Sequence, residues 1–472
     1  MIKDKNFYKT IFTIALPSAF QALISFLVVI ADNVMTSYIG DGVSAQAAVS
    51  QVNSITAFYT ASMLGLVSGS SVLIAQYWGK HDTLRIKKIF AFMMALCFGV
   101  SCLFLAAARI FGDGIIGLVI TSGDAATLEY ASVYFGIVCF SYIPYALSYS
   151  FVGMLRAVEI VRVTLYITLA ALVTNIGLNY VLIFGKLGFP QMGVAGAAVA
   201  TLVSRIVEMI IVWTYTFAIQ KKFPLKLREM FTTERALIKD YFKFGFPVAL
   251  GDTQWALIGM LKAAIIGGMG TVFMAANSIA SSMAQLGTMF TFALAGGACV
   301  VVGKTVGAGK YDTVRQYSKT IQIMFALIGV VMALIVFFIR KPFISLYGSS
   351  FDADVFSLAS TMIIILAATV PLTSYHASCF VGINRGAGDS RFVMKVDLIC
   401  GWLIVLPTTY LAAFVFNAPL PVVFLCTRID QCFKWIIAFI RLRGNKWIKN
   451  VTHGDNADDN AKESPLKIEK NS

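Results

Sequence analysis

The first long apolar run of the chain, residues 11–35, contains two residues that membrane helices usually exclude, Pro17 and Asp32. The run is long enough to cross a bilayer, because about 20 residues rising about 1.5 Å each span the hydrocarbon core. An ionised carboxylate there costs roughly 2.5 to 3.5 kcal/mol, so a central Asp32 is expected to be paired in a polar cavity or neutral part of the time. Alternatively, Asp32 marks the outer end of the helix and meets water. The position of Asp32 alone is compatible with either a proton or cation site or a helix end.

The composition indicates a polytopic membrane protein. Hydrophobic residues make up 58% of the chain and charged residues 13%, and the mean hydropathy is +0.78, which is too apolar for a soluble fold. The apolar runs are too many and too internal to be a cleaved signal peptide. The sequence has no P-loop, metalloprotease or serine-hydrolase motif, and its eight Cys residues lie in apolar runs without a CxxC pair. It therefore predicts neither an enzyme nor a metal or redox cofactor.

Hydropathy and charge together predict the membrane topology. Most of the 38 Lys and Arg residues lie in alternate connections, on the side that contains both chain ends. The positive-inside rule then places both termini in the cytoplasm. The net charge of +14 follows these loops, so we expect no nucleic-acid partner. The predicted spans are residues 11–35, 46–73, 89–111, 131–154, 163–184, 194–219, 241–266, 273–303, 318–339, 355–382, 396–417 and 418–440.

The chain consists of two similar halves. Residues 244–247 (Phe-Gly-Phe-Pro) resemble residues 14–17 (Ile-Ala-Leu-Pro), and residues 309–313 resemble residues 79–83, both at an offset of 230. Each half has six predicted spans, an even number, so the halves are related by an axis along the membrane normal. The sequence therefore predicts an all-α polytopic membrane protein, with twelve transmembrane helices in two pseudo-symmetric six-helix lobes around a central cleft. The expected boundaries are a lobe at 1–219, a cytoplasmic linker at 220–243, a lobe at 244–450 and a disordered cytoplasmic tail at 451–472.

The sequence resembles the MATE family, the multidrug and toxic compound extrusion transporters, in four features. These are the repeat, the spacing of Pro17 and Asp32, the Gly-Lys-x-Asp loops after spans two and eight, and the fifth-span sequence Asn-Ile-Gly-Leu-Asn-Tyr at 175–180. The likeness covers about residues 7 to 447. It implies a monomeric secondary antiporter in the cytoplasmic membrane. Such a protein exports organic cations or amphiphilic drugs by alternating access while H⁺ or Na⁺ enters, and it needs no other cofactor.

The resemblance also implies a proton or cation site in the first lobe. In many prokaryotic members the first-span Asp, which matches Asp32, acts with an Asn and an Asp on the fifth span. The Asn matches Asn175, but Asn179 stands where the Asp is expected. These two residues are one helical turn apart and share a face, which leaves Asp32 as the titrating group. Pro17 is the expected hinge, because it removes one helical hydrogen bond and lets the helix bend.

A second cation site is less clearly indicated. A second group of the family has acidic residues on spans seven and ten, where this chain has Trp255 and Ser374. The nearest candidates for a replacement site are Asp252, Gln254 and His376.

Charged residues inside spans six and twelve are interpreted as structural ion pairs. Arg205 and Glu208 are three residues apart and can pair directly on a helix. Arg428 and Asp430 occupy the corresponding place in the second half, but residues two apart point away from each other. Asp430 therefore needs another partner, such as Lys434 four residues on.

Aromatic and methionine side chains in the spans beside the cleft suit flat or bulky organic cations. In a chain with 37 Phe, each could instead be a core or lipid-facing residue. Two functional alternatives also remain. Coupling to Na⁺ is one, since Asp32, Asn175 and Asn179 offer hard oxygen ligands; the other is a lipid-linked oligosaccharide flippase of the same plan, which would have a cationic cleft. The candidate cleft residues are Tyr59, Tyr142, Tyr149, Trp255, Met283 and Met289.

Overall fold

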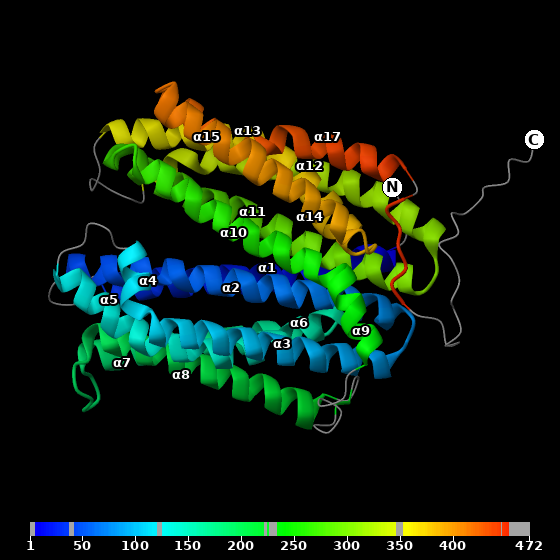
Figure 1. Cartoon of the computed structure of the whole chain (residues 1–472), viewed down its shortest axis with the longest axis horizontal. Helices are drawn as coiled ribbons and strands as arrows, with labels where there is room; N and C mark the ends of the chain where they lie inside the picture. The colour runs from blue at the N-terminus through cyan, green and yellow to red at the C-terminus, as the bar shows by residue number, and fades with distance from the viewer. Residues whose placement is uncertain are drawn as a thin grey trace, which may run out of the picture.

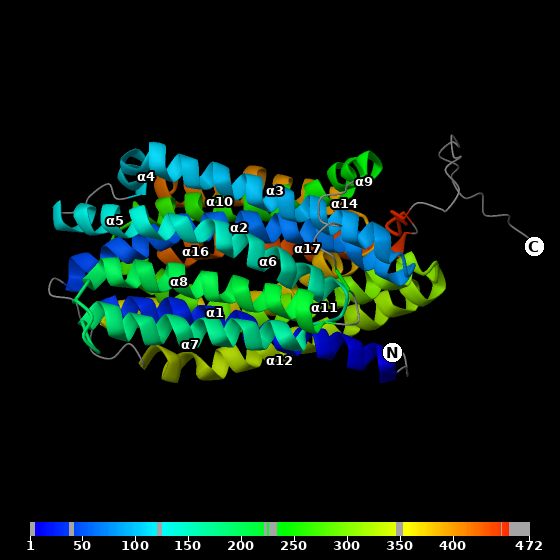
Figure 2. The ribbon, with the colours of Figure 1, turned by 90° about the horizontal axis from the view of Figure 1, so that it is seen from below.

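The computed structural model describes residues 5–36, 42–119, 125–220, 224–225, 234–345, 353–444 and 446–452, without the side chains of 29–34, 36, 42, 43, 118, 119 and 271. Every regular element in these ranges is helical. The long helices run along one axis of the molecule (Figures 1 and 2). The start of α1 (Lys5–Thr36) and the last described residues lie at the same end of the bundle, which we call the terminal end (Figure 1).

The first lobe contains six expected spans. The fourth is α5 joined through a short 3₁₀ turn to α6, and the sixth is α8 extended by a π-helical turn at Tyr215–Ile219. α4 is a short additional helix between the third and fourth spans. The elements are α1, α2 (Gly42–Gly79), α3 (Thr83–Ile110), α4 (Gly112–Val119), α5 (Ala125–Val138), α6 (Tyr142–Ala157), α7 (Arg162–Phe184) and α8 (Gly193–Thr214).

The second lobe follows α9 (Arg235–Asp240) and a π-helical turn at Tyr241–Gly245. π-helical turns at Ser378–Arg385, Ile399–Val405 and Leu411–Val415 interrupt its tenth and eleventh spans. Its helices are α10 (Phe246–Gly267), α11 (Thr271–Gly307), α12 (Tyr311–Ser345), α13 (Ala353–Ala377), α14 (Ser390–Leu398), α15 (Leu406–Tyr410), α16 (Leu420–Cys426) and α17 (Asp430–Arg443).

Ten described segments are long and apolar enough to cross a membrane. The other two predicted spans depart from that pattern for identifiable reasons. α10 carries Asp252, Gln254 and Lys262, which lower its hydropathy. The last span is broken between α16 and α17 at residues 427–429. With these two, the structure contains the twelve predicted spans.

The two halves repeat local structure as well as sequence. Asp82 caps the start of α3, where its carboxylate accepts the Arg85 backbone N–H at 3.0 Å and pairs with the Arg85 guanidinium at 3.1 Å. In the second half, Asp312 at the start of α12 pairs with Arg315 at 2.8 Å. Carboxylates are favourable there because the N-terminus of a helix carries partial positive charge.

The lobes meet through equivalent helices, with α1 and α2 packed against α10 and α11. Only glycine allows the closest approaches. A Cβ on Gly69 would lie 2.3 Å from the Gly245 carbonyl oxygen, and one on Gly79 would lie 1.9 Å from that of Lys304. A Cβ on Gly307 would lie 1.8 Å from the Gln76 carbonyl oxygen. The backbones of α2 and α11 are therefore in direct contact at the terminal end.

Polar groups join the lobes at the same end. Lys304 Nζ on α11 lies 2.8 and 2.9 Å from the two carboxylate oxygens of Glu159, in the connection between α6 and α7. Trp78 Nε1 on α2 donates to the same carboxylate at 3.5 Å. Farther from the terminal end, the buried cluster around Met283 draws on the second lobe alone. Among the described residues, these ion pairs and hydrogen bonds between the lobes thus lie at the terminal end.

The expectation of a disordered tail from residue 451 is wrong at its start. Val451 is 4% exposed, and its backbone N–H donates to the Gln76 side chain at 2.9 Å. A polar, mixed-charge sequence follows, and its composition hid this buried apolar residue. The remaining tail lies outside the described residues.

Candidate functional site

The two fifth-span asparagines lie together in the interior of the first lobe. Asn175 is 2% exposed and Asn179 is 0% exposed, both on α7. Asn179 Nδ2 donates to Asn175 Oδ1 at 3.3 Å, and Asn175 Nδ2 donates to Thr201 Oγ1 on α8 at 3.5 Å. The pair thus presents neutral amides on one face of the helix, as their spacing indicates.

Asp32 belongs to α1, which packs against α7. Its side chain lies outside the described residues, so the predicted contact between this carboxylate and the asparagine pair stays a prediction. Pro17 lies within α1, and the helix continues through it.

A further polar contact between α1 and α7 was missed by the sequence reasoning. Gln21 Nε2 donates to Thr168 Oγ1 at 2.8 Å and to the Thr164 carbonyl at 3.3 Å. Gln21 Oε1 accepts a hydrogen bond from Arg156 Nη2 at 3.2 Å. The available signal was an amide four residues after Pro17 in an otherwise apolar run. Thr164, Thr168 and the two asparagines form one buried polar stripe along α7.

Most of the predicted cleft residues of the first lobe are core residues. Tyr59 and Tyr142 are 1% and 2% exposed, and their rings stack with centroids 4.2 Å apart. The Tyr59 hydroxyl donates to the Tyr142 carbonyl at 2.6 Å and lies 2.8 Å from Ser101 Oγ. A substrate cannot reach these two rings in this conformation. Tyr149 is partly buried and stacks on Tyr145 at 5.4 Å.

Arg205 and Glu208 form an ion pair in α8. Arg205 Nη1 lies 2.8 Å from Glu208 Oε2, and its guanidinium carbon lies 5.1 Å from the centre of the Tyr145 ring. A carboxylate and an aromatic face thus hold the cation in place.

In the second lobe, Asp252 is bound to an arginine. Arg385 Nη2 and Nη1 donate to its two oxygens at 2.7 and 3.2 Å. Gln254 accepts a bond from Trp402 Nε1 at 3.1 Å, and His376 Nδ1 lies 3.1 Å from the Leu372 carbonyl oxygen. The three residues proposed as a replacement cation site therefore bind separate partners, and none of these contacts joins one to another.

Lys434 is the centre of a buried charge cluster that the sequence reasoning only half identified. Its ammonium lies 3.0 Å from Asp430, the predicted partner, and 2.9 Å from Asp397 on α14. The Lys434 side chain is 3% exposed, and its Nζ lies 4.3 Å from the centre of the Trp255 ring. No local spacing indicates the contact with Asp397.

Arg428 points away from Asp430, as their spacing of two residues indicates, and it binds a hydroxyl group instead of a carboxylate. Its Nε donates to Thr369 Oγ1 on α13 at 2.9 Å, and its ion pair with Asp430 is not formed. The turn between α16 and α17 directs Arg428 toward α13, while Asp430 lies within reach of Lys434.

The other cleft candidates of the second lobe differ in exposure. Met283 is 3% exposed in the lobe core, Met289 is partly buried, and Trp255 is 36% exposed. Trp255 is thus the most accessible of the six candidates, and it lies against Lys434 and Lys262, whose Nζ is 5.2 Å from the ring centre.

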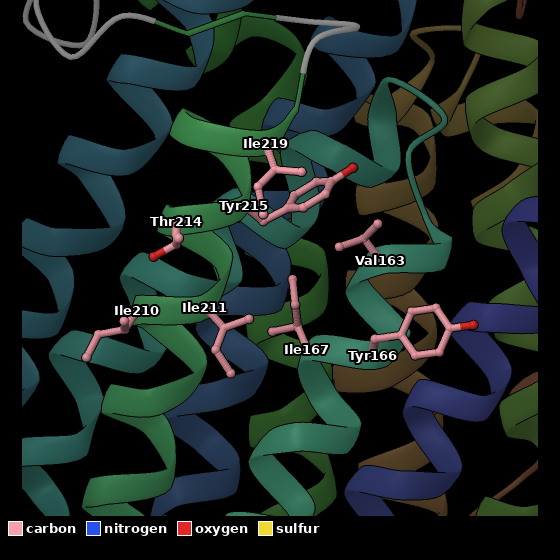
Figure 3. A pocket seen from close by; sticks show the side chains of 8 residues that line it. All are labelled: Val163, Tyr166, Ile167, Ile210, Ile211, Thr214, Tyr215 and Ile219. Atoms are coloured by element: carbon pink, nitrogen blue, oxygen red, sulfur yellow. The ribbon is translucent and has the colours of Figure 1, made fainter.

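One surface groove has a volume of about 310 Å³ and lies between α7 and α8 (Figure 3). Its walls are apolar apart from the hydroxyl groups of Thr214, Tyr166 and Tyr215. None of the lining residues belongs to the four helices that join the lobes, so this groove is distinct from the expected central cleft.

Comparison with known proteins supports the two-fold repeat of the sequence. The family model MatE matches residues 17–181 and again residues 247–411, two segments displaced by 230 residues. Both matches begin at a proline, Pro17 and Pro247. The chain belongs to the MATE family of transporters.

Relatives of this MATE protein include the uncharacterized transporter YisQ of Bacillus subtilis, 24% identical over 94% of this chain and 96% of that one. A probable multidrug resistance protein NorM of Halalkalibacterium halodurans is 28% identical over 74% and 75% of the two chains. The fold is similar to a crystal structure of a variant of the Vibrio cholerae MATE transporter VcmN. That likeness has a TM-score of 0.83 and 16% identity over 94% and 98% of the chains. The protein is a multi-pass membrane transporter rather than an enzyme.

Proposed function

We propose that this MATE transporter exports organic cations or amphiphilic drugs in exchange for H⁺, and that Asp32 takes up and releases the proton. The name of the NorM relative, a probable multidrug resistance protein, supports drugs as the substrate class. The partly exposed Trp255 supplies a flat apolar surface for an amphiphilic drug, but Lys434 and Lys262 already lie against its ring, so it does not favour a cation over a neutral drug.

One observation carries the choice of Asp32. The predicted spans contain five carboxylates, and the structure describes the side chains of four. Each of these four has a Lys or Arg nitrogen within 3.0 Å. Protonating Glu208 or Asp252 would leave its Arg without an ionised partner, and protonating Asp397 or Asp430 would deprive the buried Lys434 of one of its two carboxylates, which is unfavourable. Asp32 is the fifth, and the four described pairs are Glu208–Arg205, Asp252–Arg385, Asp397–Lys434 and Asp430–Lys434.

The asparagine pair supports a carboxylate that changes charge. Amides can donate a hydrogen bond to a carboxylate and accept one from a carboxylic acid, so both protonation states find partners. A fixed positive charge in the same place would favour the ionised form alone. Asn175 and Asn179 therefore suit a proton site better than a permanent ion pair.

The closed terminal end supports alternating access. The Lys and Arg distribution makes this end cytoplasmic, so a cleft between the lobes would open outward in this conformation. Export then requires the α2–α11 contact and the Glu159–Lys304 pair to separate when substrate enters from the cytoplasm.

Coupling to Na⁺ is a second candidate. Amide and carboxylate oxygens are the ligands that hard cations prefer, and both asparagines are buried. A flippase is less favoured, because two of the cations within the predicted spans, Arg205 and Lys434, are paired with carboxylates.

The decisive experiment measures drug-driven proton release from purified protein in liposomes, for the wild type, Asp32→Asn and Asp252→Asn. We expect Asp32→Asn to abolish proton release and efflux while the protein remains folded. Full efflux by the Asp32→Asn variant would refute the proposal. Efflux driven by an imposed Na⁺ gradient, without a response to a pH gradient, would instead establish sodium coupling.

A further inference from the structure

The last described residues, 446–452, cross from one lobe to the other at the terminal end, and we call them the C-terminal strap. Trp447 is 2% exposed and packs in a cluster with α11, α12 and the start of α1. Val451, four residues later, is 4% exposed and packs in the cluster of the first lobe. The strap thus buries Val451 against the first lobe and Trp447 against α11, α12 and the start of α1.

The strap is fixed to the second lobe by several contacts. Lys449 Nζ lies 2.7 Å from Asp389, a fully buried carboxylate that also binds Arg441 at 2.7 Å. The Lys449 backbone N–H donates to the Ala387 carbonyl at 2.8 Å. Gly388, at a φ of 84°, passes so close that a Cβ would lie 2.6 Å from the Lys449 carbonyl oxygen. One ion pair, a backbone bond and a backbone contact hold this end of the strap.

Fewer contacts hold the strap to the first lobe, and they centre on Gln76 of α2. Val451 N–H donates to Gln76 Oε1 at 2.9 Å, and Gln76 Nε2 donates to the Lys449 carbonyl at 3.3 Å and the Gly386 carbonyl at 3.1 Å. Gln76 is 0% exposed. All three partners belong to the strap or the second lobe, so this buried amide finds these bonds only while the terminal end is closed.

Gln76 also marks the place where the lobes touch. Its carbonyl oxygen is the atom that a Cβ on Gly307 would meet at 1.8 Å. Any separation of α2 from α11 therefore pulls Gln76 away from the strap, which remains tied to Asp389.

We propose that the C-terminal strap is a latch that stabilises the closed terminal end, with Asp389 as its permanent anchor and Gln76 and Val451 as its releasable contacts. This inference rests on the proposed alternating access. It makes the strap a determinant of how often the transporter opens to the side on which its termini lie.

The test measures the distance between spin labels attached at Thr83→Cys and Gln316→Cys, which are exposed positions at the terminal ends of α3 and α12. The native cysteines are replaced in all proteins compared. We expect Val451→Asp, and a chain that ends after residue 445, to raise the population with a long distance at least fivefold. A chain that ends after Thr452 keeps the strap and should match the wild type, as should the apolar Val451→Ile.

Unchanged distances in both Val451→Asp and the chain ending at 445 would overturn the latch. Should the shortened chain fail to fold, Val451→Asp alone decides. The measurement is made without drug or ion gradient, so it does not depend on which ion is coupled. If the wild type shows no drug-driven proton release while Val451→Asp still raises the population with a long distance, the proposed function is refuted and the latch is retained.

Discussion

Among single residues, the carboxylates that stabilise the fold through ion pairs differ from Asp32, the carboxylate proposed to take up and release the proton. Asp252, Asp397 and Asp430 lie within 3.0 Å of a Lys or Arg nitrogen; the first two pairs connect different helices of the second lobe, and the third lies within α17. Sequence spacing could indicate the pair of Asp430 with Lys434, because four residues make one helical turn. It could not indicate Asp397 or Arg385 as partners, because those contacts depend on how distant helices pack.

Lys434→Met is expected to destabilise the protein by about 3–5 kcal/mol, because it leaves two carboxylates in the lobe interior without their cation. Thermal unfolding in detergent measures the loss. Lys434→Met combined with Asp397→Asn and Asp430→Asn removes the unpaired charges and should recover part of it. A single variant as stable as the wild type would contradict a structural role.

Asn179→Asp should widen the pH range of transport. The new carboxylate lies one turn from Asn175, in the cluster assigned to Asp32, and two nearby carboxylates hold the first proton more tightly than one does. Proton release on drug binding should therefore extend to higher pH than in the wild type. Asn175→Gln, which adds no charge, is the control, and identical pH profiles for Asn179→Asp and the wild type would place the proton site elsewhere.

At the scale of elements, the sequence predicted what local patterns encode and missed what long-range packing decides. The spans, their order and the Pro17–Pro247 repeat follow from hydropathy and spacing. The π-helical turns in the second lobe and the break at residues 427–429 do not, because neither changes the average hydropathy. The strap was missed because Val451 is a single apolar residue beside a polar tail.

Pro17→Ala is expected to slow transport more than it weakens drug binding. Pro17 has no N–H, so the Thr13 carbonyl loses its helical bond and α1 can bend there. Pro421→Ala is the control, since Pro421 stands in the first turn of α16, after an extended residue, where a missing N–H costs little. Comparing the turnover rate and drug affinity of both variants tests the hinge. Equal effects on turnover would contradict it.

Gly69→Ala should weaken the contact between the lobes. Its Cβ would lie 2.3 Å from the Gly245 carbonyl oxygen, so α2 and the start of α10 must separate. We expect slower efflux and lower thermal stability. Gly99→Ala on α3 meets nothing within 4 Å and serves as the control. Wild-type behaviour of both variants would show that the close approach is not needed.

For the whole molecule, the charge pattern and the closed end together indicate which side of the membrane is closed. The terminal end carries most of the Lys and Arg residues and is the end where the lobes are bonded. A cysteine introduced at Asp312, in the first turn of α12, should therefore react with impermeant thiol reagents only after the cells are opened. Labelling in intact cells would reverse the assigned orientation.

The crossing of α2 and α11 at Gly79 and Gly307 has a further consequence. These helices are counterparts in the repeat, and each places a glycine against the backbone of the other. Reciprocal contacts of this kind are the signature of a two-fold dimer interface. The transporter is therefore built as a homodimer of six-helix units would be, with the two subunits fused into one chain. Because the strap follows the second unit alone, it breaks that symmetry at the same interface.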